Sequence, residues 1–67
     1  MNGLLKKRDS LRAKRLKKGF TQEQLAKEAG VSKETIKSLE YGRVNPSFGL
    51  MLKLCDILEA KAEDFFR

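Results

Sequence analysis

Apolar residues recur at helical spacing along most of the chain, and glycine and proline interrupt this pattern repeatedly. The pattern predicts helices over about residues 9–18, 22–29, 33–41 and 46–58, followed by a last short helix near 61–66. No stretch shows the alternation of a β-strand, and no internal repeat or linker is visible. The sequence therefore predicts an all-α fold, a compact bundle of five short helices.

The stretch over residues 21–42 carries the most complete set of helix boundary signals. Thr21 is followed three residues later by Gln24, which is the capping-box pattern at a helix N-terminus. Gly30 falls where this helix should end, and Ser32 soon after it supplies a second N-cap. Two short helices joined by such a turn are typical of the helix-turn-helix motif, whose second helix enters the major groove of DNA.

The fourth predicted helix is apolar over much of its circumference, which indicates either deep burial or two different partners. Asn45 is expected to cap it, with Pro46 at the first helical position, where a missing N–H does no harm. One apolar stripe is expected to face the core, and it consists of Phe48, Met51, Leu52, Cys55 and Leu58. A second apolar stripe consists of Leu50, Leu54 and Ile57. Together with the nearby Phe66, this stripe is the candidate dimer interface. The alternative is that the stripe is buried beneath the N-terminal segment.

Length and charge limit the options further. There is room for one small domain over residues 1–67, and residues 1–8 are expected to fray because they carry no strong cap. A core of this size is marginal, and the single Cys55 excludes an internal disulfide, so self-association is the expected support. The net charge is +6, and residues 1–18 carry the excess, with eight Lys and Arg against Asp9. This charge favours a polyanionic partner, although a solvated helix face with a basic tail has the same distribution.

Several classes of function find no support in the composition. The chain has no histidine, one cysteine and no phosphate-binding glycine loop, so neither a zinc site nor an activated nucleophile can be assembled. We therefore expect no enzymatic activity, no metal, no cofactor and no small-molecule ligand. No apolar run approaches the length that spans a membrane, and a lone thiol suits a reducing compartment. A cytoplasmic protein without membrane association is expected.

Two stretches, TQEQLAKEAGVS from Thr21 and LEYGRVNPS from Leu39, resemble the Xre/Cro/cI-type helix-turn-helix DNA-binding domain family. The resemblance extends over about residues 11–66. It implies a lambda-repressor-like bundle of five helices that binds double-stranded DNA in the major groove. The chain departs from the family pattern at Lys14, where an aliphatic residue is frequent, and at Glu59, where glycine often ends the fourth helix. Such departures concern the packing of the first and last helices.

The resemblance also implies positions for DNA contacts. It places the base contacts on the first turns of the recognition helix, at Lys33, Glu34, Lys37 and Ser38. A lysine there donates to guanine O6 and N7, and Glu34 accepts from cytosine N4 or turns toward a neighbouring lysine. Phosphate contacts are expected at two helix N-termini, whose free N–H groups favour an anion. Gln22 lies at the first, and Arg43, Asn45 and Ser47 surround the second, with capping alone as the alternative for Asn45.

Arg15 and Glu40 are charged residues at positions that otherwise face the core, so each needs a partner. In the family, an arginine six residues before the cap of the motif's first helix pairs with a glutamate just before the glycine that ends its second helix. The two residues fit both offsets. The resemblance therefore implies a structural ion pair between the first helix and the recognition helix, and exposure of both charges to solvent is the alternative.

Together these observations predict a sequence-specific DNA-binding transcriptional regulator. It is expected to act as a homodimer on a palindromic operator, most simply as a repressor that occupies the DNA. Two alternatives stay open. One is an antitoxin or immunity component of a two-protein system, whose apolar surface binds a different protein. The other is a helical protein-interaction module without DNA binding, which the charge balance of the middle third of the chain permits.

Overall fold

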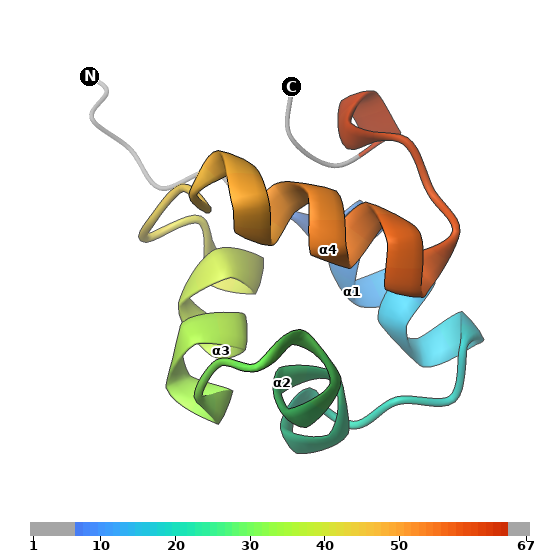
Figure 1. The fold of residues 1–67 in the computed structure, drawn as a ribbon, viewed down its shortest axis with the longest axis horizontal. Helices are drawn as coiled ribbons and strands as arrows, with labels where there is room; N and C mark the ends of the chain where they lie inside the picture. The colour runs from blue at the N-terminus through green and yellow to red at the C-terminus, as the bar shows by residue number, and fades with distance from the viewer. Residues whose placement is uncertain (1–6, 65–67) are drawn as a thin grey trace.

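The helices follow the predicted order along the chain. The computed structural model describes residues 7–64, and within this range it contains four α-helices, one short 3₁₀-helix and no strand. The all-α prediction is thus confirmed. α4 runs along one side of the molecule, α1 lies behind it, and α2 and α3 lie on the opposite side (Figure 1). The bounds are α1 Asp9–Lys17, α2 Gln22–Ala29, α3 Lys33–Tyr41, α4 Phe48–Leu58 and the 3₁₀-helix η1 Ala62–Asp64.

The predicted boundaries of α2 and α3 are confirmed. Thr21 Oγ1 accepts the N–H of Gln24 at 3.0 Å, and Gln24 Oε1 accepts the N–H of Thr21 at 2.9 Å, which completes the capping box. Ser32 Oγ caps α3 by accepting the N–H of Thr35 at 3.2 Å. Each helix ends at a glycine in the left-handed conformation, with φ of 74° after α2 and 77° after α3. These local bonds determine the angle at which α3 leaves the turn.

The start of α4 differs from the prediction. Ser47 is the N-cap in place of Asn45, and its Oγ accepts the N–H of Leu50 at 3.2 Å. Asn45 instead accepts a hydrogen bond from Arg8 at Oδ1, at 2.5 Å. Asparagine and serine are equally strong caps, and a proline restrains the residue before it to an extended conformation. Two local signals of similar strength thus compete here, and in this structure the Asn45 oxygen is engaged by Arg8 while Ser47 is the cap.

The predicted fifth helix is a single 3₁₀ turn in the described residues, so the count of five helices is wrong. Lys61 O accepts the N–H of Asp64 at 2.9 Å, and Asp64 Oδ2 accepts the N–H of Lys61 at 2.9 Å. Residues 65–67, where the predicted helix continued, lie outside the described residues.

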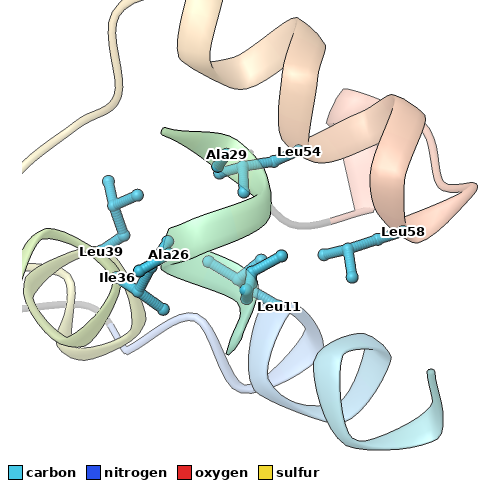
Figure 2. Packing of buried hydrophobic residues seen from close by; sticks show 8 residues of the cluster. Leu11, Ala26, Ala29, Ile36, Leu39, Leu54 and Leu58 are labelled. Carbon is cyan, nitrogen blue, oxygen red and sulfur yellow. The ribbon is translucent and has the colours of Figure 1, made fainter. Parts of the chain in front are cut away.

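The hydrophobic core lies where the four α-helices meet (Figure 2). Ala26 and Ala29 are each 2% exposed, and their small side chains let α2 approach both α3 and α4 closely. Figure 2 shows Ala29 beside Leu54, at the contact between α2 and α4. Every α-helix contributes to the core, which consists of Leu11, Leu25, Ala26, Ala29, Ile36, Leu39, Leu54 and Leu58.

The buried face of α4 matches the predicted one only in part: Leu58 of the expected stripe is buried and Cys55 packs against the core, but Leu54 comes from the other stripe. Leu54 and Leu58, four residues apart, are buried with 0% and 1% exposure. Of the stripe expected to face the core, Phe48 is 71% exposed and Leu52 is 52% exposed. Because α4 is apolar on both sides, periodicity alone does not choose between them, and the choice is made by the fit of the leucines against α2.

The burial of Leu54 also corrects the candidate dimer interface. Leu54 belongs to the core and is unavailable to a partner chain. Leu50 and Ile57 are partly buried and pack against the core, so they present only part of their surface. Phe66 lies outside the described residues. Within residues 7–64, no helix is long and apolar enough to cross a membrane.

Candidate nucleic-acid interface

The side of α3 that faces away from the core is polar at every position expected to read bases. Ile36 and Leu39 anchor the opposite side of the helix and are fully buried. Spacings of one, four and five residues place the polar positions on two adjacent rows of the helix. Lys33 and Glu34 are exposed, and Lys37 and Ser38 are half-buried. Donors and an acceptor thus project from the first turns of α3.

Glu34 is not engaged by its neighbours. In the described part of the chain, neither Lys33 nor Lys37 lies within ion-pair distance of its carboxylate. The side chain is exposed at the second position of α3, where the helix dipole favours a negative charge. Its oxygens are therefore available to a hydrogen-bond donor from outside the chain.

Gln22, the first residue of α2, is half-buried and is oriented from within the protein. Its Nε2 donates to Glu40 Oε1 at 3.1 Å. An amide nitrogen carries two hydrogens, so one donor remains available after this bond. The helix N-terminus also presents backbone N–H groups at this point. The start of α2 can therefore bind an anion without breaking the internal bond.

Arg15 and Glu40 form a buried ion pair between α1 and α3. Arg15 Nε lies 2.5 Å from Glu40 Oε2 and Arg15 Nη2 lies 3.3 Å from Oε1, while Arg15 Nη1 donates to Phe20 O at 2.8 Å. The two side chains are 7% and 6% exposed. Within residues 7–64, no buried side-chain nitrogen or oxygen lacks a hydrogen-bond partner. The pair joins the helix that leads into the motif to the helix that ends it.

The loop between α3 and α4 holds the second set of expected phosphate contacts. Arg43 is exposed, and its guanidinium lies 5.2 Å from the centre of the Tyr41 ring. The ammonium of Lys7 lies 5.6 Å from the same ring. Both distances are within the range of cation–π interactions. Tyr41 therefore gathers two positive charges beside the end of α3, close in sequence to the exposed Asn45 and Ser47.

Arg8 is a residue that sequence reasoning missed, because it assigned this part of the chain to a frayed tail. Its guanidinium donates to Leu39 O at 2.7 Å, to Val44 O at 2.9 Å and to Asn45 Oδ1 at 2.5 Å. Burial lowers the pKa of the Arg8 side chain from its ordinary value. One signal pointed to such a contact: the last turn of α3 contains no basic residue to balance its carbonyl groups.

An open groove of about 880 Å³ runs beside α1, the first turn of α2 and both ends of α3. Lys7, Arg12 and Lys33 line it together with Gln22, and the acidic Asp9 and Glu23 line it as well. The groove thus connects expected phosphate and base contacts on one side of the molecule. Within residues 7–64, no group of three or more acidic or cysteine side chains is placed to hold a metal ion.

A small all-α domain with an exposed, polar third helix set by a capped turn is a helix-turn-helix protein. Residues 11–65 match the Helix-turn-helix family, and the chain belongs to its Xre/Cro/cI-type DNA-binding branch. This is a family of transcriptional regulators and not of enzymes.

Similar proteins support this assignment. An uncharacterised HTH-type transcriptional regulator of Archaeoglobus fulgidus is 48% identical over 59 residues, covering 88% of this chain and 84% of the relative. The restriction-modification controller protein C.AhdI of Aeromonas hydrophila matches with a TM-score of 0.76 and 33% identity, over 87% of this chain and 88% of that one. The clp gene regulator ClgR of Corynebacterium glutamicum matches with a TM-score of 0.74 and 36% identity, over 82% of this chain and 58% of the ClgR chain.

Proposed function

We propose that this protein is a sequence-specific regulator of transcription that represses by occupying operator DNA. The observation that carries the proposal is the polar face of α3, which is held outward by the core contacts of Ile36 and Leu39. Lys33 donates to guanine and Glu34 accepts from cytosine, with Lys37 and Ser38 one turn further along. As a DNA-bound regulator it acts in the cytoplasm.

Phosphate contacts on either side of this face position the domain on the duplex. Gln22 supplies one from the start of α2, and its remaining amide hydrogen is suited to a phosphate oxygen. Arg43, Asn45 and Ser47 supply the other from the loop before α4. The names of two structural neighbours, a restriction-modification controller and a clp gene regulator, support control of gene expression as the role of such a domain.

The homodimer is the second part of the proposal. Phe48 and Leu52 lie four residues apart on α4 and are 71% and 52% exposed, so they offer an apolar surface to a second copy. A pair related by a two-fold axis would contact half-sites about 34 Å apart, one turn of the DNA helix. Replacing both residues with glutamate should leave the chain monomeric in light scattering and weaken operator binding. A wild-type chain that stays monomeric both free and on DNA would refute this part.

DNA binding is tested by selecting duplexes from a random library with the purified protein at near-physiological salt, because phosphate-driven binding weakens steeply with salt. We expect a palindromic site with half-sites one turn apart. On that site, Lys33→Ala should cost about 1–3 kcal/mol and relax specificity at one base pair. Lys27→Ala, which removes an equal charge from the exposed side of α2, is the matched control and should bind normally. If no sequence is enriched, the regulator function is refuted.

A further inference from the structure

We propose that Arg8 is a positioning residue for DNA binding, which acts by holding Asn45 so that the amide of Asn45 donates to a phosphate. This inference rests on the proposed function and extends it to a residue outside the helix-turn-helix. Arg8 lies directly before α1, more than thirty residues from the loop that it contacts. It thus links the start of the domain to the loop between α3 and α4.

The first step is the attachment of Arg8 to the end of α3. Its backbone N–H donates to Glu40 O at 2.8 Å, and its Nη1 donates to Leu39 O at 2.7 Å. The last carbonyl groups of a helix have no partner within the helix and carry partial negative charge. The backbone N–H of Arg8 thus satisfies Glu40 O, and its guanidinium adds a second donor to Leu39 O, which also accepts the N–H of Gly42, together with the positive charge that the last turn of α3 lacks.

The second step is the orientation of the loop. The same guanidinium reaches Val44 O at 2.9 Å and Asn45 Oδ1 at 2.5 Å. Three acceptors are therefore arranged around one planar fork, a geometry that the single ammonium of lysine does not reproduce. Once Oδ1 is engaged, both hydrogens of Asn45 Nδ2 remain as donors. Asn45 is exposed and lies two residues before the N-cap of α4, whose free N–H groups also favour an anion.

The test measures affinity for the selected duplex at several salt concentrations by fluorescence anisotropy. Arg8→Ala should weaken binding about tenfold, and Arg8→Lys should not restore it. Asn45→Ala should weaken binding to a similar extent, and the double variant should bind no more weakly than Asn45→Ala alone. The slope of affinity against salt should stay unchanged in Arg8→Ala, because Arg8 neutralises no phosphate, whereas Arg43→Ala should lower it by about one.

Three results would overturn the inference. The first is that Arg8→Ala binds the duplex normally although its thermal midpoint falls, because Arg8 would then be merely structural. The second is that Arg8→Ala lowers the slope of affinity against salt by about one, because Arg8 would then contact a phosphate directly. The third is that the losses of affinity in Arg8→Ala and Asn45→Ala add in the double variant, because the two residues would then act independently.

A further variant keeps the test decisive if Arg8→Ala does not fold. Asn45→Asp retains the acceptor for Arg8 but removes the donor to phosphate, so it should fold and bind more weakly than the wild type. Normal binding by Asn45→Asp would overturn the inference. Failure of the proposed function itself is distinguishable, because the wild-type chain would then enrich no duplex before any variant is compared.

Discussion

Removal of the Glu40 carboxylate is the sharpest test of how this small domain is held together. Glu40 accepts from Arg15 Nε at 2.5 Å, from Arg15 Nη2 at 3.3 Å and from Gln22 Nε2 at 3.1 Å. Glu40→Ala removes all three bonds at once. Arg15 is only 5% exposed, so its guanidinium would stay buried without a counter-charge, bonded to the Phe20 carbonyl.

The cost can be set against the total stability of the domain. Breaking a buried ion pair by removing one partner costs about 3–5 kcal/mol, because the remaining charge has lost both water and its partner. At the usual stability per residue, a domain of this length has a free energy of unfolding of about 3–10 kcal/mol. Glu40→Ala should therefore remove between a third and all of it. With a urea m-value of about 1 kcal/mol per molar, the urea midpoint should fall by about 3–5 M, or no folded baseline should remain.

The assay is urea unfolding followed by circular dichroism at 222 nm. Glu28→Ala is the matched control, since Glu28 is exposed on α2, and it should change the stability by less than about 0.5 kcal/mol. The double variant Arg15→Met, Glu40→Leu should be more stable than either single replacement, because it strands no charge. The reasoning fails if Glu40→Ala unfolds at the same urea concentration as Glu28→Ala.

Three further outcomes are expected. Ser47→Ala removes the cap of α4 and should cost about 1 kcal/mol in the same urea titration. Lys18 Nζ lies 2.8 Å from Glu59 Oε1 and lowers the pKa of the Glu59 carboxyl. The ion pair therefore stabilises the fold at pH values above the pKa of Glu59 in the unfolded chain, and this stabilisation is lost as the pH falls through the lower pKa of the folded chain. Lys18→Ala should raise the pKa of Glu59 in an NMR titration. Burial and the charge of Asp64 raise the pKa of the Cys55 thiol, so Asp64→Asn should speed its reaction with a disulfide reagent at neutral pH.

The helix-turn-helix was predictable because its signals are local. Thr21 and Gln24 are three residues apart, and each bond of the capping box closes within that distance. Gly30 is required by a positive φ at one position. Such features depend little on the rest of the chain, so the sequence alone is enough to predict them.

The errors fall where two local signals compete and a distant contact decides. α4 has apolar residues on both sides; Leu58 is buried as expected, and the position of Ala29 beside Leu54 buries part of the other side as well. Asn45 and Ser47 are equivalent caps by type, and the position of Arg8 separates them. Neither contact leaves a trace in the spacing of residues, because each joins segments far apart along the chain.

The same bonds that escaped sequence reasoning explain how the expected DNA contacts are prepared. Gln22 is held by Glu40 through one hydrogen of its amide, Asn45 is held by Arg8 through its oxygen, and the Ser47 oxygen accepts the N–H of Leu50. Each internal bond leaves at least one N–H or O–H donor of that side chain unused. Restraining a side chain before binding lowers the entropy lost when it meets its partner. These internal bonds therefore orient the three side chains that are proposed above to contact phosphate.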